Sequence, residues 1–312
     1  MKSPRWLLGS VFSLPVVLFI ATSTVYAAPI RVDCNKGGSI NSTLASLASA
    51  GNTRGITILV TGTCKENVLV YPFDHLTLQA APIATIQDVS NGTLPAVQIF
   101  SSYDVTLTGF TINGGSPAVT CNTDSSCTLY LSRIQGATDG VTFGSSHGRV
   151  FSCTVSNNSN RGIAVVNGST VVTDSNTISG NGNAGVQVNF GSTLTATSDT
   201  IQNNGAVGIR VVQGSVLRAF DLTITGNSAD GVRVEQASTA SFSQQAGGNV
   251  ITGNGGNGVS LGDLSFAQFN DTNNVSGNLG QPDVACNPQY SATRGAATVG
   301  GTTNCVETQH SR

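Results

Sequence analysis

Short runs of alternating hydrophobic and polar residues recur along the chain at a nearly constant interval, as from Val141 to Ile163 and on to Val186. The period is clearest in three consecutive rows, residues 160–182, 183–205 and 206–228. They read NRGIAVVNGSTVVTDSNTISGNG, NAGVQVNFGSTLTATSDTIQNNG and AVGIRVVQGSVLRAFDLTITGNS. A single row of this length cannot bury its own apolar side chains. The repeat therefore predicts a solenoid in which successive rows stack and share one core.

Two apolar columns run through eight successive rows, two positions apart within each row. Residues that alternate at i and i+2 point to the same face of a strand, so we expect both columns to point inward and the residue between them outward. Each row has room for two further short strands, such as Ser192–Ala196 and Asp199–Gln202. The inward columns are Val97, Val119, Val141, Ile163, Val186, Ile209, Val232 and Val259, and Ile99, Cys121, Phe143, Val165, Val188, Val211, Val234 and Leu261. Between them lie Gln98, Thr120, Thr142, Ala164, Gln187, Arg210, Arg233 and Ser260.

An asparagine column follows the last inward residue of each row. Asparagine tolerates the left-handed backbone of tight turns and bonds readily to neighbouring backbone groups. Six asparagines in one register predict a ladder of side-chain hydrogen bonds along one corner of the solenoid. They are Asn158, Asn181, Asn204, Asn227, Asn254 and Asn278.

These rows resemble the right-handed parallel β-helix of the pectate-lyase-like superfamily over about Ile56 to Cys286. The resemblance implies an all-β fold, a single-stranded right-handed parallel β-helix of about 9–10 coils. It implies no single activity, because the superfamily contains lyases, hydrolases, epimerases, adhesins and phage tailspikes.

The segment from Met1 to Ala27 is expected to be a signal peptide. Lys2 and Arg5 give a positive start, an apolar run follows, and Val25-Tyr26-Ala27 suits cleavage after Ala27. An uncleaved membrane anchor is the alternative, but the apolar run is short for a membrane span and contains Pro15. We expect a protein that is secreted or held in the cell envelope, extracellular or periplasmic, with no transmembrane segment after cleavage.

Both ends of the solenoid are expected to be covered, because an open end exposes unpaired strand edges. Residues 28–54 would form an N-terminal cap with a short capping helix that begins after Ser39. Residues 55–285 would form the β-helix, and residues 286–312 a C-terminal cap and tail.

All seven cysteines lie beyond the signal peptide, where export makes disulfides possible. Cys153 would remain a free, partly shielded thiol. No Cys/His spacing indicates a zinc site, and we expect no metal and no cofactor. The proposed pairs are Cys34 with Cys64, Cys286 with Cys305, and Cys121 with Cys127 across the interior of one coil, where two buried thiols are the alternative.

The number and placement of charged residues narrow the range of expected partners. Charged residues make up 10% of the chain and the formal net charge is −2, with no basic patch, so nucleic acid is not an expected partner. Arg210 and Arg233 should lie on top of each other on adjacent coils, which is unfavourable unless they are neutralised. Either Asp230 and Glu235 neutralise them, or the two guanidinium groups hold an anion such as a uronate carboxylate. The candidate glycan-binding set is Gln187, Asn189, Arg210, Asp230, Arg233 and Glu235.

The same columns provide no catalytic constellation. Asp139 and Asp230 share a column but lie four coils, roughly 19 Å, apart and cannot share a calcium ion. Asp139 next to Arg161 should form only a weak surface ion pair. Asp230 and Glu235 are near each other, but Arg233 lies between them in the sequence.

Two further motifs do not alter that conclusion. Asn122-Thr123-Asp124 and Ser146-His147-Gly148 resemble two polygalacturonase motifs, but the paired-aspartate and RIK motifs of that family are missing. His75 and His310 have no evident partner in the sequence. We predict a non-catalytic protein of surface adhesion, envelope structure or polysaccharide binding, which could form an oligomer and whose partner is a polysaccharide or a cell-surface glycan. The alternative is a polysaccharide lyase, glycoside hydrolase or epimerase that acts on uronate-containing glycans.

Overall fold

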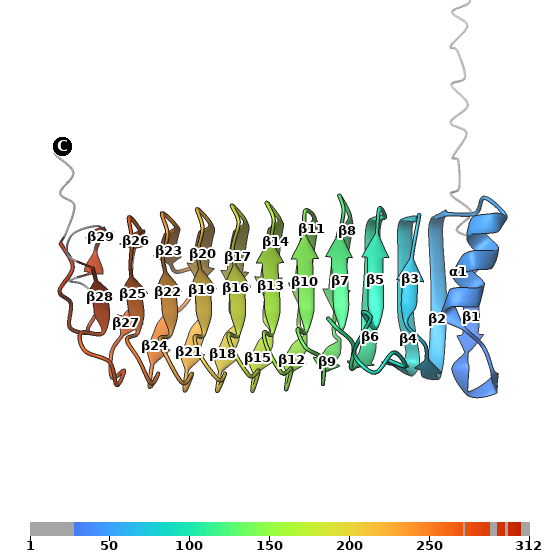
Figure 1. The fold of residues 1–312 in the computed structure, drawn as a ribbon, viewed down its shortest axis with the longest axis horizontal. Coiled ribbons are helices and arrows are strands. Elements are labelled where there is room, and N and C mark those ends of the chain that lie inside the picture. Colours follow the sequence, from blue (N-terminus) through green and yellow to red (C-terminus); the bar gives the residue numbers. More distant parts are fainter. Residues whose placement is uncertain (1–27, 271, 288–291, 297–298, 307–312) are drawn as a thin grey trace, which may run out of the picture.

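The computed structural model describes residues 28–270, 272–287, 292–296 and 299–306. The signal peptide expected over residues 1–27 lies outside these residues, as does His310. The described chain forms one long stack of coils, in which colour changes steadily from the blue end to the red end (Figure 1). Each coil is one full turn of the chain around the stack.

One face of the stack is a sheet of ten parallel strands, called sheet B here, in which every coil contributes one strand. This count agrees with the 9–10 coils expected. The strands are β3 Val68–Val70, β5 Val97–Phe100, β7 Val119–Asn122, β10 Val141–Gly144, β13 Ile163–Val166, β16 Val186–Val188, β19 Ile209–Val211, β22 Val232–Val234, β25 Val259–Leu261 and β28 Val284–Cys286.

The other faces belong to a sheet of nineteen strands, called sheet A here, to which a regular coil contributes two strands. The first four are β1 Ile30–Asp33, β2 Arg54–Lys65, β4 Asp74–Gln87 and β6 Tyr103–Asn113. Then come β8 Ser126–Tyr130, β11 His147–Phe151, β14 Thr170–Asp174, β17 Thr193–Thr197, β20 Val216–Phe220, β23 Thr239–Ser243, β26 Phe266–Phe269 and β29 Ala292–Arg294. The last strands of the coils are β9 Arg133–Gln135, β12 Thr154–Ser156, β15 Thr177–Ser179, β18 Thr200–Gln202, β21 Thr223–Thr225, β24 Val250–Thr252 and β27 Asn274–Val275.

The strand register confirms the inward columns. Val186 pairs with Ile163 on one side and with Ile209 on the other, and all three are buried. The outward column is less uniform than expected. Gln187 and Arg210 are half-buried, whereas Ala164 is fully buried. Ala164 has the shortest side chain of the three, so its longer neighbours on adjacent coils can cover it.

The asparagine ladder is also confirmed. Asn181 Nδ2 donates to Asn204 Oδ1 at 2.9 Å, and Asn204 Nδ2 donates to Asn227 Oδ1 at 2.8 Å. Asn204 also donates to the carbonyl of Ile178, and its Oδ1 accepts from the backbone N–H of Asn181. Each buried amide is thus bonded to the coils on both sides, which fixes the register of the stack.

The ladder explains why a glycine precedes the inward strand in the regular coils. A Cβ atom on Gly185 would lie 2.6 Å from Cγ2 of Ile201, 2.7 Å from the carbonyl oxygen of Gly208 and 2.8 Å from Nδ2 of Asn204. No side chain fits there unless the backbone shifts.

A second ladder, made of serine, was missed in the sequence. Ser169 N donates to Ser192 Oγ and Ser192 N donates to Ser215 Oγ, each at 3.2 Å. These serines follow the same constant period, but serine is so common in this chain that the column did not stand out.

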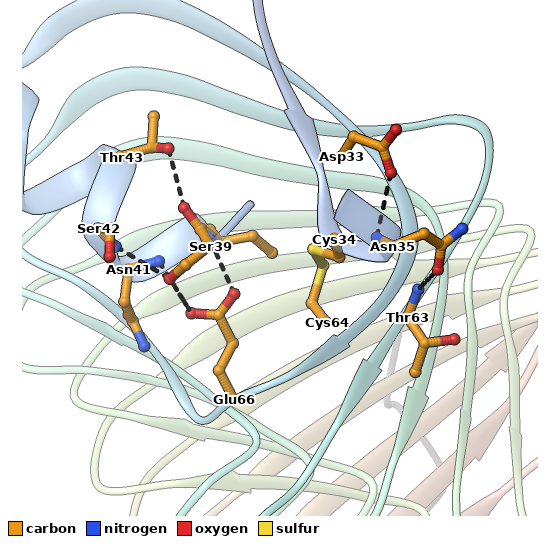
Figure 2. The surroundings of a disulfide bond; sticks show 11 residues. Asp33, Cys34, Asn35, Ser39, Asn41, Ser42, Thr43, Thr63, Cys64 and Glu66 are labelled. Carbon is orange, nitrogen blue, oxygen red and sulfur yellow. Dashed lines mark hydrogen bonds between the residues drawn. A yellow bond between two sulfur atoms is a disulfide. The ribbon is translucent and has the colours of Figure 1, made fainter. Parts of the chain in front are cut away.

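The N-terminal cap contains the expected helix, α1 Ile40–Ser49, whose N-cap is Ser39. Glu66 from the first coil bonds the same end of the helix, because its carboxylate accepts from Ser39 Oγ at 2.9 Å and from the backbone N–H groups of Ile40 and Asn41 (Figure 2). The preceding segment is more regular than a simple lid. β1 extends sheet A by pairing in parallel with β2, and the short 3-10 helix η1 Cys34–Lys36 follows it.

All three proposed disulfides are present. Cys34–Cys64 ties the cap to the first coil (Figure 2), Cys286–Cys305 closes the C-terminal end, and Cys121–Cys127 lies within one coil. Cys153 is a free thiol, as expected, but it is buried rather than partly shielded. Burial raises the pKa of this thiol to about 11, so it is protonated at neutral pH and chemically quiet.

Candidate functional site

The six predicted ligand residues lie together near the C-terminal half of sheet B. Arg210 on β19 pairs in register with Gln187 on β16 and with Arg233 on β22. The two guanidinium groups therefore come from adjacent strands, about 4.8 Å apart.

Each arginine has its own carboxylate. Arg233 Nε lies 2.7 Å from Asp230 Oδ2, and Arg210 Nη2 lies 3.3 Å from Glu235 Oε2. Asp230 is buried and held further by Ser260 Oγ at 2.6 Å and by the backbone N–H of Asn257 at 2.9 Å. Asp230 and Glu235 thus neutralise the two like charges, which is the first of the two interpretations given for this pair of arginines.

The two ion pairs are not equivalent. Asp230 fixes Arg233 from a buried position, whereas Arg210 makes one longer contact and its side chain is 43% exposed. Arg210 Nε is buried and has no hydrogen-bond partner among the described residues. Asn189 on the coil before is 7% exposed, and its Oδ1 atom is also buried without a partner in the described part of the chain. A free donor and a free acceptor therefore lie on neighbouring coils of this face.

The carboxylates of this face are already engaged. Asp230 is occupied by hydrogen bonds and an ion pair, and Glu235 contacts Arg210. Neither is a free acid poised opposite the other, as hydrolysis of a glycoside would require. Among the described residues, the one group of side chains close enough to share a metal ion is Cys34, Cys64 and Glu66. The thiols of that group form a disulfide, and its carboxylate bonds the start of α1.

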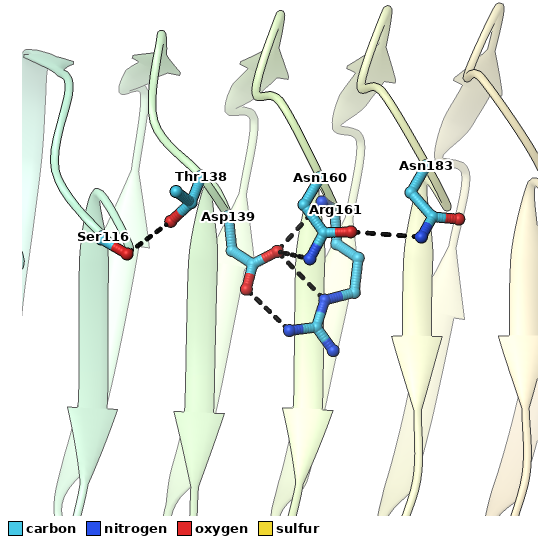
Figure 3. A network of polar contacts seen from close by, with 6 residues as sticks. All are labelled: Ser116, Thr138, Asp139, Asn160, Arg161 and Asn183. Carbon is cyan, nitrogen blue, oxygen red and sulfur yellow. Dashed lines mark hydrogen bonds and ion pairs between the residues drawn. The ribbon is translucent and has the colours of Figure 1, made fainter.

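Asp139 and Arg161 form a stronger contact than expected. The guanidinium binds the carboxylate with two parallel bonds, Nε to Oδ1 at 3.0 Å and Nη2 to Oδ2 at 2.7 Å, and Asn160 Nδ2 also donates to Oδ1 (Figure 3). The side chain of Arg161 is only 22% exposed and that of Asp139 only 13%. The expectation of a weak surface ion pair was wrong, because the periodic register places the residues but does not show how deeply they lie between coils.

His75 was expected to have no partner, and this was also wrong. Its ring contacts Asp74 through Nδ1, and Nε2 lies 3.5 Å from Asp104 Oδ2 on the next coil. No periodic signal marks this contact in the sequence, since the step from Val68 to Val97 is longer than the period and the regular spacing starts only later.

Comparison with known proteins agrees with the geometry of the stack. A family model described as a right handed beta helix region matches residues 84–221. The chain is a right-handed parallel β-helix protein with the pectate-lyase-like fold. No curated protein matches the sequence of this β-helix protein. Within the described residues, no helix has the length and apolar character needed to cross a membrane.

Solved structures with the same fold have diverse activities. The pectate lyase Pel9A superimposes with a TM-score of 0.65 and 12% identity, over 86% of this chain and 80% of that chain. The A-module of mannuronan C-5 epimerase AlgE6 of Azotobacter vinelandii gives 0.59 and 15%, over 84% and 92%. The enzymatically active domain of tailspike protein 2 of bacteriophage CBA120 gives 0.56 and 12%, over 86% and 47%. At such low identity the fold is shared, and the chemistry of this β-helix depends on its own side chains.

Proposed function

We propose that this β-helix protein acts outside the cytoplasm as a non-catalytic binder of uronate-containing polysaccharide, through the outer face of sheet B. The observation that carries the proposal is the pair of guanidinium groups in register on β19 and β22, next to the unpaired Arg210 Nε and Asn189 Oδ1 atoms. Buried polar atoms without partners are rare in folded proteins, and a bound ligand is one way to satisfy them.

The two arginines would have different roles. Asp230 holds Arg233 in place, so this guanidinium is oriented before any ligand arrives. Arg210 would exchange its single contact with Glu235 for a carboxylate of the glycan, which a guanidinium binds with two parallel hydrogen bonds. Gln187, which is half-buried beside Arg210, offers an amide to sugar hydroxyls.

Export is supported by the three disulfides, which persist in oxidising compartments. The absence of catalysis is supported by the engaged carboxylates of sheet B. The second candidate function is a lyase, hydrolase or epimerase of uronate glycans, and it is favoured by the named activities of the pectate lyase and the epimerase that share the fold.

Calorimetry with hexagalacturonate and with alginate hexamers tests the proposal. We expect binding that weakens at least tenfold in Arg210→Ala and Arg233→Ala, because each change removes a charged hydrogen-bond donor worth roughly 1.5–3 kcal/mol. Arg218→Ala is the matched control, since Arg218 is an exposed arginine on β20 in sheet A. Equal affinity in all three variants would refute the site. Unsaturated, shortened or epimerised products, with or without Ca²⁺, would support the enzyme instead.

A further inference from the structure

A second candidate site lies on a different sheet, in the N-terminal half of the β-helix. Two hollows of about 450 Å³ and 470 Å³ open on sheet A, and both are lined by His75 and Asp104. Because they share these two residues, the hollows adjoin each other along the stack, and together they are called the groove here. The groove crosses the strands β2, β4, β6, β8, β11 and β14 in that order. Six strands with a spacing of about 4.8 Å give a length of about 24 Å along the stack.

The floor of the groove is a line of hydroxyl groups followed by a cation and, on β14, by Val172. Its residues come from one register column, so each lies directly on the residue of the coil before. The threonines are half-buried, which leaves their hydroxyl groups able to donate and accept at the surface. The column consists of Thr57, Thr77, Thr106 and Thr128, followed by Arg149.

One wall of the groove carries the groups that are best suited to fix a ligand. His75 and Asp104 have left-handed backbone conformations, with φ of 58° and 52°, and are held on neighbouring strands with His75 Nε2 and Asp104 Oδ2 3.5 Å apart. His147 stands further along the same wall, on β11.

Tyr103 adds an aromatic surface at the edge of the groove. It is 60% exposed, although it starts the strand β6 and borders the same hollow as His147 and Arg149. An exposed tyrosine ring has an apolar face and a polar hydroxyl, which suits contact with a ligand that is itself both apolar and polar.

The charged residues around the groove indicate which kind of ligand it would bind. Arg54 is paired with Asp74 at 3.0 Å, and the exposed carboxylate of Asp104 is balanced by Arg149 at the other end. Counted together with Asp74, the ion-pair partner of Arg54, the two arginines and two aspartates around the groove balance each other, so a densely acidic chain is not favoured. A long groove with a hydroxyl floor, an aromatic edge and no net charge matches a linear neutral polysaccharide.

We propose that this groove binds a segment of a neutral hexose polysaccharide that lies along the axis of the β-helix. Sugar hydroxyls bond the threonine line and the His75–Asp104 pair, and one pyranose ring packs on Tyr103. The site is independent of the arginine face on sheet B, which would take an acidic glycan. The protein would thereby hold two chemically different polymers on two of its faces.

The experiment measures calorimetric binding of the exported chain to the β-1,4-linked hexaoses of glucose and mannose and to the β-1,3-linked hexaose of glucose. We expect at least one to bind, and its affinity to fall at least tenfold in Tyr103→Ala and in the double variant Thr106→Val/Thr128→Val. Valine keeps the shape of threonine and suits a strand, so this variant removes hydroxyl groups and leaves the fold intact.

Arg210→Ala serves as the control, since it removes the proposed acidic-glycan site and should leave neutral hexaose binding unchanged. Failure of all three neutral hexaoses to bind would overturn the groove proposal, as would binding that survives both groove variants. Hexagalacturonate binding that depends on Tyr103 would overturn the assignment to a neutral ligand. A loss of hexagalacturonate binding in Arg210→Ala alone concerns the sheet B site and supports the independence of the two sites.

Discussion

Asp199 has a carboxylate at a buried position where the preceding coil has the amide of Asn176. Replacing Asp199 tests how such buried side chains stabilise the stack. Asp199 is 1% exposed. Its Oδ1 accepts from the backbone N–H and Nδ2 of Asn176, and its Oδ2 accepts from the hydroxyl of Thr173. In Asn176 the corresponding Nδ2 atom donates to the carbonyl of Val150. An asparagine at position 199 would keep Oδ1 as the acceptor for Asn176, and its Nδ2 would replace the bond from the Thr173 hydroxyl by donating to the equivalent carbonyl, that of Thr173, all without a charge.

The magnitude follows from the titration of the carboxyl. Burial raises its pKa from 3.8 to about 6, and the hydrogen bonds from Thr173 and Asn176 offset only part of that rise. The contribution to stability is therefore fully present below the unfolded value of 3.8 and is lost as the pH rises to about 6. A difference of about 2 units corresponds to roughly 3 kcal/mol of unfolding free energy. We expect Asp199→Asn to be more stable than the parent at pH 7 by up to this amount and nearly equal to it at pH 3.5.

Urea denaturation of both proteins at pH 3.5, 5 and 7 measures the effect. The informative quantity is the difference between the two unfolding free energies at each pH, since the other titrating groups cancel in it. Asn204→Asp is the mirror control, because it places a carboxylate in the neighbouring ladder and should lose more stability at pH 7 than at pH 3.5. Asp124→Asn, at an exposed position, should follow the parent at every pH. Curves for Asp199→Asn that run parallel to the parent from pH 3.5 to 7 would refute the reasoning.

Three further substitutions test other parts of the stack. Asn204→Ala leaves buried groups on both neighbouring coils without partners and should destabilise the protein by roughly 2–4 kcal/mol in urea denaturation, and a loss below about 0.5 kcal/mol would count against the ladder. Glu66→Ala removes three bonds from the start of α1. It should speed hydrogen exchange in that helix, whereas Glu66→Gln keeps part of the protection and unchanged exchange in both would contradict the capping role. Asp221 accepts from four successive backbone N–H groups of residues 245–248, which outweigh the opposing effect of burial and lower its pKa. Asp221→Ala should therefore speed exchange in this loop with little change in global stability, and an unaltered loop would show that the carboxylate does not hold it.

The candidate site shows which contacts the sequence repeat can predict and which it cannot. The constant spacing of the rows was enough to place Arg210 directly beside Arg233 and to name Asp230 and Glu235 as one of two possible ways to neutralise them, which the structure shows. It could not show that Arg233 is held by a buried carboxylate while Arg210 is left with an unpaired Nε atom among the described residues. Those differences depend on side-chain rotamers and on the packing of long side chains between coils, which vary although the backbone repeats.

The regular part of the fold was predictable from the amino-acid order alone: the solenoid, its register and the asparagine ladder. This was possible because stacking forces residues one period apart into contact, so a column in the alignment of rows is a column in space. The contacts of the irregular N-terminal coils, such as Glu66 with α1 and His75 with Asp104, emerged only in three dimensions. There the coil length departs from the period, and the packing of each loop and the left-handed backbone at His75 and Asp104 bring together residues that no fixed spacing relates.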